Sequence, residues 1–401
     1  MPDHKLPELE GRTPLEAAST PNLDAIAKRA EIFGIAKTIP DPLPPGSDVG
    51  NLAVLGYDPT TYYTGRSPFE AASIGITLGK TDVTLRCNLV TLAEKNGRTV
   101  MEDYSAGHIT DDDAAGIIKD LKREFDGEEF SLSQGVSYRH LLLWRGGNSG
   151  IRTTPPHDIS GKVILPWLPS GEGAEKLALL MEKSRGILKD HPVNAKRRAE
   201  GKNTADSIWL WGEGTRPEMP SLFELYGITG SVVSAVDLVK GIGMFAAMEV
   251  IEVPGATGYL DTNYAGKVSG ALESLRRVDL AMIHIEATDE TGHVGDARLK
   301  IQAVEDFDRK VVGPALEGMK QFGQYRVLVL SDHPTPIDLR THSNEPVPFA
   351  ILDSANSSVR DASLVYTEDC AAASGVFVKE GWKLMGTLVS KQGRRPFRDN
   401  T

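Results

Sequence analysis

The sequence predicts an α/β protein with a doubly wound sheet and a smaller inserted α/β domain. At 401 residues the chain exceeds the size at which a single hydrophobic core stops growing, so two domains are expected. Short aliphatic or β-branched runs recur, and helical patterns such as residues 297–312 separate the late ones, as in a parallel doubly wound sheet. The predicted strands cover residues 84–91, 140–144, 231–236, 280–285, 326–330 and 347–352.

The middle of the chain differs in composition from the segments on either side of it. Residues 81–217 are richer in loops and basic side chains, and we interpret them as an inserted cap, or substrate domain. Residues 1–80 and 218–401 then form the core domain beneath it. The basic side chains of the middle segment include Arg86, Arg139, His140, Arg145, Arg152, His157, Arg197 and Arg198.

Composition and charge narrow the class of protein. Hydrophobic residues make up 40% and charged residues 25%, as is usual for soluble proteins. A formal net charge of -11 argues against a nucleic-acid or membrane partner. No stretch resembles a signal peptide or a membrane span, so a cytoplasmic location is expected, while the oligomeric state stays open. Cys87 and Cys370 cannot form a disulfide framework and are interpreted as small core residues.

Two helix starts are predicted early in the chain. Thr20 is placed as the N-cap of a helix with Pro21 at its first position. Residues 39–45 are too rich in proline to be helical, whereas residues 48–55 can form a helix. Ser47 is therefore predicted at a helix N-terminus, a position that suits an anion.

Side chains of the kind that bind metals gather late in the chain. Asp289 and His293 follow one predicted strand, Asp332 and His333 end another, and His342 comes nine residues later. Each pair alone also fits a helix surface or a turn. Together, at strand ends in one half of the chain, they favour a metal site. Carboxylate and imidazole without cysteine suit Mn²⁺ or Zn²⁺, and Mg²⁺ is possible but less favoured.

Several motifs resemble a known superfamily. Three late segments are similar to the metal motifs of the alkaline phosphatase superfamily: HIEATDETGH at 284–293, LSDHPTP at 330–336 and THS at 341–343. Three early segments resemble its archaeal-type cofactor-independent phosphoglycerate mutases: PPGSD at 44–48, GYDP at 56–59 and YYTGR at 62–66. Three middle segments extend the resemblance over nearly the whole chain: RCNLVT at 86–91, TPPHDI at 154–159 and WLWG at 209–212.

The resemblance implies an alkaline phosphatase-like fold and two divalent metal ions. One ion would be held by Asp289, His293 and His342, and the other by Ser47, Asp332 and His333. Ser47 would be the nucleophile: it would take the phosphoryl group from 3-phosphoglycerate and return it to the 2-hydroxyl, without 2,3-bisphosphoglycerate as a cofactor.

The small phosphorylated hydroxy acid of such a reaction needs cations to hold it. A mutase must also exclude water while it retains glycerate, which is a physical reason for a basic cap. The candidates for binding substrate or for acid/base work are Arg86, Arg139, His157, Asp158, Arg197 and Lys240. Each of them also fits a solvated surface charge.

The start of the chain departs from the family pattern. The resemblance implies an apolar strand ending in Gly-Asp-Gly-Met, whose aspartate binds the metal shared with Ser47. Here Met1 is followed by Pro2 and Asp3, so we expect both that strand and its aspartate to be absent. Neither Asp3 nor Asp48 aligns with the aspartate. Unpaired strand edges and a weakened second metal site would follow.

Other functions fit the same sequence. A phosphomonoesterase or a homoserine kinase-like phosphotransferase could use the same scaffold, because cap residues decide the substrate. A weakly active protein would follow from the absent strand. A non-catalytic binding protein is the alternative of a different class, although folding alone does not require the set of Asp and His residues.

Overall fold

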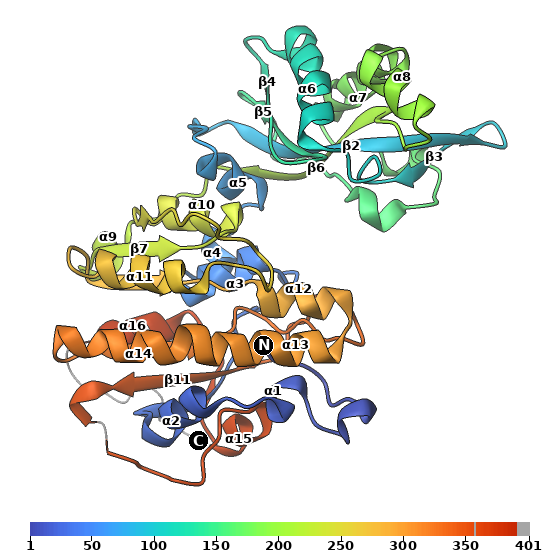
Figure 1. Ribbon diagram of the computed structural model, residues 1–401. Helices are drawn as coiled ribbons and strands as arrows, with labels where there is room; N and C mark the ends of the chain where they lie inside the picture. Colours follow the sequence, from blue (N-terminus) through green and yellow to red (C-terminus); the bar gives the residue numbers. More distant parts are fainter. Residues whose placement is uncertain (357, 391–401) are drawn as a thin grey trace. The chain divides into compact units, whose positions relative to one another are not determined.

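The computed structural model describes residues 1–356 and 358–390, which form two compact units (Figure 1). Unit 1 comprises Met1–Tyr63 and Glu218–Thr401, and unit 2 comprises Thr64–Pro217. The predicted insert at 81–217 lies within unit 2, which begins earlier in the chain. The reason is that Ser67, at the start of α5 (Ser67–Ser73), is buried and donates to the carbonyl of Thr84 at 2.8 Å.

Unit 1 contains two separate sheets. The order of the first is β10 (Arg326–Leu330), β11 (Val347–Asp353), β1 (Ile32–Ala36) and β12 (Phe377–Val378). The order of the second is β8 (Glu249–Val250), β7 (Gly230–Val233) and β9 (Leu280–Ile283), all parallel. In the first sheet, β11 runs antiparallel to both neighbours, unlike the parallel arrangement predicted. Residues 331–346 contain no helix to carry the chain back across the sheet, so the chain reverses direction there.

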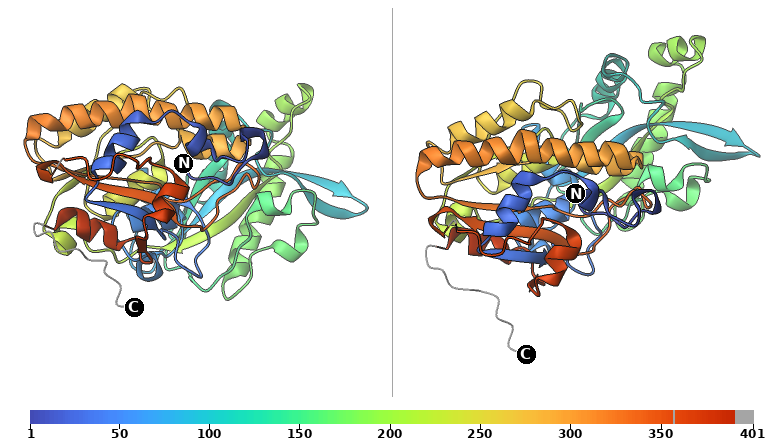
Figure 2. Two further views of the ribbon diagram at one scale, coloured as in Figure 1. Left: turned by 90° about the horizontal axis from the view of Figure 1, so that it is seen from below. Right: turned by 60° about the horizontal axis from the view of Figure 1, so that its bottom comes forward.

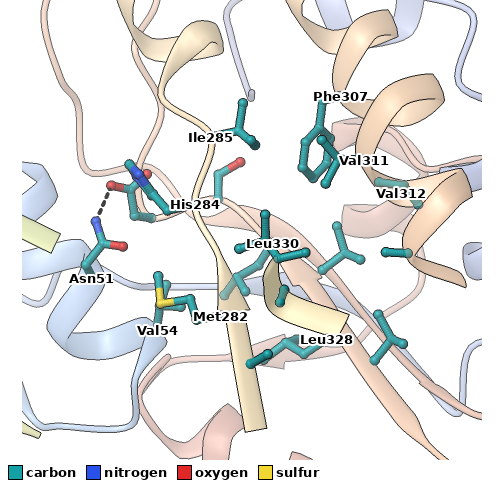
Figure 3. A pocket seen from close by; sticks show the side chains of 18 of the residues that line it. Asn51, Val54, Met282, His284, Ile285, Phe307, Val311, Val312, Leu328 and Leu330 are labelled. Carbon is teal, nitrogen blue, oxygen red and sulfur yellow. Dashed lines mark hydrogen bonds between the residues drawn. The ribbon is translucent and has the colours of Figure 1, made fainter. Parts of the chain in front are cut away.

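An apolar cavity of about 290 Å³ lies between the two sheets of unit 1 (Figure 3). Its walls include Met282 of β9, Leu328 and Leu330 of β10, and the helical residues Phe307 and Val311. Among the described residues, β9 and β10 each have a partner strand on one side only. We call this opening the β9–β10 groove, and its two sides are the edge strands of separate sheets.

A long helical rod packs on unit 1 (Figure 2). It consists of α13 (Ala297–Phe307), a π-helical turn (Asp308–Val312) and α14 (Gly313–Met319). The N-terminal helices α1 (Pro14–Ala17) and α2 (Pro21–Arg29) lie along it. Thr20 precedes α2 as predicted, but its side chain makes no capping hydrogen bond. The carboxylate of Asp308 caps the helix instead, because it accepts the backbone N–H of Leu23 at 2.7 Å.

The remaining helices of unit 1 are short. They are α3 (Ser47–Val54), α4 (Pro59–Tyr62), α9 (Leu222–Tyr226), α10 (Asp237–Phe245), α11 (Tyr264–Ser274), α12 (Ala287–Val294), α15 (Glu368–Ala373) and α16 (Lys383–Val389). Within the described ranges we find no helix with the length and apolarity that a bilayer crossing requires.

Unit 2 is built around one long strand. The strand β2 (Val83–Lys95) pairs with β3 (Arg98–Asp103), β5 (Arg139–Trp144) and β6 (Ser207–Thr215), and β4 (Phe130–Ser133) pairs with β5. Its longer helices are α6 (Asp111–Phe125), α7 (Ala174–Lys189) and α8 (Pro192–Ala199). Cys87 lies in the core of this unit, as predicted, and burial raises the pKa of its thiol.

Candidate active site

Ser47 is the first residue of α3, as predicted from the proline-rich loop before it. Its side chain is buried, and its Oγ lies 2.9 Å from Nε2 of His333. Nδ1 of His333 lies 3.1 Å from the carbonyl oxygen of Pro334, which can only accept. Nδ1 therefore carries the ring proton, and Nε2 accepts the hydroxyl of Ser47. Burial lowers the pKa of His333, which favours this neutral ring.

Asp332 follows β10 and joins this group through Asn51. The amide nitrogen of Asn51 donates to the carbonyl of Ser47 and to Oδ2 of Asp332, each at 2.9 Å. Figure 3 shows this amide pointing toward the carboxylate. Asn51 thus ties the helix that carries Ser47 to the strand end that carries Asp332. We define Ser47, Asp332 and His333 as the serine cluster.

A second group, which we call the aspartate cluster, consists of Asp289, His293 and His342. One ligand atom from each lies within 4.8 Å of the others, so this group can hold a metal ion. Nε2 of His293 lies 3.2 Å from Oδ2 of Asp289 and 3.0 Å from Nε2 of His342. Nδ1 of His293 lies 3.0 Å from the carbonyl oxygen of Arg340, which fixes the ring with Nε2 toward the cluster.

The charges of the aspartate cluster fit a cation. Burial alone would raise the pKa of Asp289, but His293 and His342 beside it hold that pKa well below its usual range. Asp289 in turn raises the pKa of His293 to about 9. Two ring nitrogens that face each other beside a carboxylate need either a proton or a metal ion between them, and the set of one carboxylate and two imidazoles suits a divalent ion.

The serine cluster and the aspartate cluster are neighbours. The ring centroids of His333 and His342 lie 4.1 Å apart. The structure therefore brings together all six side chains that the sequence placed at the reaction centre. They reach it from α3, from α12 after β9, and from the long loop after β10.

Five of the six substrate-binding candidates lie on unit 2, and three of them contact aromatic rings. The guanidinium of Arg86 lies 4.4 Å from the ring of Trp211, and that of Arg139 lies 5.2 Å from the ring of Tyr138. His157 contacts Trp211 edge-on, with ring centroids 5.4 Å apart. Asp158 beside it is exposed. These four side chains stay candidates for substrate binding.

The other two candidates have different partners from those expected. Arg197 is 2% exposed and donates to Asp113, Asn203 and Ala106, all within unit 2. It is a buried structural residue, because every guanidinium nitrogen is already used. The ammonium of Lys240 lies 2.8 Å from the carboxylate of Glu252.

Asp3 and Asp48, which do not align with the aspartate of the family pattern, both have partners outside the two clusters. Asp3 forms an ion pair with Lys300 at 2.6 Å, and Asp48 accepts the hydroxyl of Tyr63 at 2.8 Å. Among the described residues, the serine cluster therefore has one carboxylate, from Asp332.

Three site residues were missed from the sequence: Asn51, Thr335 and Glu70. Asn51 lies four residues after Ser47 on one helix face, a spacing that could have drawn attention to it. Thr335 donates to the carboxylate of Asp289. Glu70 bonds Nε of Arg66 at 2.8 Å and lies 3.1 Å from Nε of Arg86, and no local pattern indicates that long-range contact.

Comparison with known proteins identifies the family. A protein-family model described as 2,3-bisphosphoglycerate-independent phosphoglycerate mutase matches residues 27–194. A relative from Geobacter sulfurreducens, named a probable 2,3-bisphosphoglycerate-independent phosphoglycerate mutase, is 51% identical over 98% of both chains. A relative from Methanosarcina barkeri, named a 2,3-bisphosphoglycerate-independent phosphoglycerate mutase, is 49% identical over 97% of both chains.

Two solved structures are similar to this chain over nearly its whole length. A protein from Pyrococcus horikoshii has a TM-score of 0.81 at 28% identity and covers 98% of this chain and 97% of its own. The cofactor-independent phosphoglycerate mutase from Thermoplasma acidophilum has a TM-score of 0.64 at 26% identity, with 97% and 96% covered. The predicted alkaline phosphatase-like α/β fold is confirmed. The chain belongs to the family of 2,3-bisphosphoglycerate-independent phosphoglycerate mutases.

Proposed function

We propose that this chain interconverts 3-phosphoglycerate and 2-phosphoglycerate through a phosphoserine at Ser47. The observation that carries the proposal is the hydroxyl of Ser47, which lies 2.9 Å from His333 and next to two adjoining Asp/His clusters. The names of relatives that are about half identical over nearly the whole chain support the choice of reaction.

The chemistry balances as two half-reactions. In the first, Oγ of Ser47 forms a bond to phosphorus, the bond from phosphorus to the 3-oxygen breaks, and that oxygen takes up the proton that Ser47 releases. In the second, the 2-oxygen forms a bond to phosphorus, the bond from phosphorus to Oγ of Ser47 breaks, and the proton that the 2-hydroxyl releases returns to Oγ. Nε2 of His333 accepts the hydrogen of Ser47 and so orients the free hydroxyl before the first transfer.

The helix that begins at Ser47 supports negative charge on the phosphoryl group. The backbone N–H groups of Ser47 and Asp48 precede the first intrahelical bond of α3, which Gly50 makes to the carbonyl of Gly46, and the helix dipole adds partial positive charge at this end. Phosphoryl oxygens on Ser47 would lie beside these groups.

Two divalent ions are proposed at the two clusters, Mn²⁺ or Zn²⁺ before Mg²⁺. Asp289, His293 and His342 would hold one, and Ser47, Asp332 and His333 the other. When bound, such ions supply positive charge that favours the alkoxide of Ser47 and the phosphoryl oxygens. Asn51 and Thr335 orient the two ligand carboxylates by hydrogen bonds.

Unit 2 is proposed as the substrate domain. Arg86, Arg139, His157 and Asp158 are its candidates for holding the carboxylate and phosphate of the substrate. Glu70 would orient Arg86 from its Nε side. Stacking on Trp211 further restricts the guanidinium, so that less conformational entropy is lost when an anion binds.

The test is a Ser47→Ala variant, with Ser269→Ala on the exposed face of α11 as the matched control. Removing a nucleophile should lower the rate of isomerisation by at least about a thousand-fold and abolish labelled phosphoenzyme. The control should keep both. Full isomerisation by Ser47→Ala would reject the mechanism, whereas phosphate release or ATP-dependent phosphorylation by the unaltered protein would favour the phosphatase or kinase alternatives.

A further inference from the structure

Lys300 forms a fully buried ion pair on the helical rod. Its ammonium lies 2.6 Å from Oδ2 of Asp3, and both side chains are 0% exposed. The same ammonium donates to the carbonyl of Thr335 at 2.8 Å. Burying two charges removes their hydration, so such a pair is weak evidence for a role in stability alone. Its hydrogen bonds indicate what the pair holds in place.

The pair holds the loop that carries Asp332 and His333 of the serine cluster. Asp3 accepts the backbone N–H of Ile337 at 3.1 Å, while Lys300 holds the carbonyl of Thr335. Both contacts fall within four residues of His333. The loop after β10 has no regular secondary structure of its own, so these two bonds fix its path.

The same loop touches the aspartate cluster directly. The hydroxyl of Thr335 donates to Oδ1 of Asp289. Its carbonyl oxygen packs so closely on α12 that a Cβ added at Gly292 would overlap it. A displacement of Thr335 would therefore move the carboxylate of Asp289 or the helix that carries it.

We propose that Lys300 and Asp3 are a positioning pair that sets the orientation of Asp289 for metal binding, acting through Thr335. Neither residue contacts the reacting atoms. The inference rests on the proposed metal site at the aspartate cluster and extends it to residues outside the cluster. Hydrogen bonds that orient a metal ligand from outside the site change metal affinity by roughly 10-fold to 100-fold.

The experiment measures Co²⁺ binding by visible absorption, which reports both affinity and ligand geometry. Lys300→Met removes the ammonium and should weaken Co²⁺ binding roughly 10-fold and change the absorption bands. Thr335→Val keeps the carbonyl that Lys300 holds but lacks the hydroxyl, so it should weaken binding to a similar extent without removing the ion pair. Thr335→Ser restores the hydroxyl and should bind Co²⁺ with nearly the unaltered affinity.

The control for loss of a buried ion pair is Arg197→Met. Arg197 pairs with Asp113 at 2.9 Å inside unit 2, so this variant should keep the Co²⁺ affinity and spectrum. Should Lys300→Met not fold, Asp3→Asn and Thr335→Val carry the test. Unaltered affinity and spectrum in those variants would overturn the positioning role while leaving the metal site intact. Absence of Co²⁺ binding by the unaltered protein would reject the metal site itself.

Discussion

The sheets of the two units differ in completeness. In unit 2 every strand joins one sheet around β2, and its core residues, such as Leu89 and Leu142, are fully buried. In unit 1 the strands β9 and β10 belong to separate sheets and face the β9–β10 groove. The proposed reaction centre lies at the carboxyl ends of these two strands. The less complete sheet therefore carries the chemistry.

This difference shows what holds the reaction centre together. Because no backbone ladder joins β9 to β10, the spacing of the two clusters depends on side-chain bonds. Asn51 links α3 to Asp332, and Thr335 links the loop after β10 to Asp289. Filling the β9–β10 groove should therefore raise the stability of unit 1 and leave the stability of unit 2 unchanged.

The largest effect is expected from a five-residue apolar segment fused ahead of Met1. The amino group of Met1 lies 3.3 Å from Oγ of Ser331, at the end of β10, so the added residues could enter the groove as a strand parallel to β10. Apolar burial should exceed the ordering entropy and raise the free energy of unfolding of unit 1 by about 3 kcal/mol. Calorimetry should show the change, and a Gly-Ser segment of equal length is the control.

An equal response to the apolar and Gly-Ser segments would contradict this account of the groove. A third version, ending in Asp-Gly before Met1, tests the aspartate implied by the family resemblance. It should increase both Co²⁺ binding at the serine cluster and isomerisation, because a second carboxylate then joins Asp332.

The next largest effect is expected on the free energy of unfolding, when one leucine from each unit is shortened to alanine. Leu142 is 0% exposed in unit 2, so Leu142→Ala should cost about 3 kcal/mol through lost burial and a new cavity. Leu328 already faces the groove and is only partly buried, so Leu328→Ala should cost about 1 kcal/mol. Denaturant unfolding of the two variants measures the difference, and equal costs would show that the groove is as tightly packed as the core of unit 2.

The sequence predicted local features better than the pairing of distant elements. Ser47 at a helix start follows from the prolines before it, and Asp289 and Asp332 after strands follow from apolar runs that end abruptly. The antiparallel course of β11 and the burial of Arg197 depend on contacts between residues far apart in sequence. No local pattern encodes those contacts, and for the same reason Thr335 and Lys300 were not identified.

The contributions of His140 in unit 2 and His293 in unit 1 to the pH dependence of stability should have opposite signs. Burial lowers the pKa of His140 in unit 2 to about 4, below its unfolded value of 6.5. Its neutral form contributes fully above pH 6.5. As the pH falls from 6.5 toward 4 the unfolded state takes up a proton first, so unit 2 should lose about 2 kcal/mol of stability. In unit 1, Asp289 raises the pKa of His293 to about 9. The stability that protonated His293 contributes is therefore lost as the pH rises toward 9.

Tryptophan fluorescence can follow unit 2, because four of the five tryptophans lie within Thr64–Pro217. His140→Gln is the matched variant, since its amide oxygen can accept the N–H of Gly135 that Nδ1 of His140 accepts at 3.1 Å. The variant should lack the loss of stability between pH 6.5 and 4. A variant with the same pH profile as the unaltered protein would assign the loss to carboxylates instead.

The smallest effect concerns the aromatic support of Arg86. Trp211→Leu keeps an apolar side chain but removes the ring that lies 4.4 Å from the guanidinium. Loss of a cation–π contact of about 1 kcal/mol should raise KM roughly 5-fold. The value of kcat should change little, because the contact restricts Arg86 equally in the bound substrate complex and in the transition state. Trp167→Leu is the control, since the ring of Trp167 supports Lys162 at 5.5 Å elsewhere on unit 2. A fall in kcat without a rise in KM would instead place Trp211 in the transfer step, and the five-stranded sheet of unit 2 would then share the chemistry with unit 1.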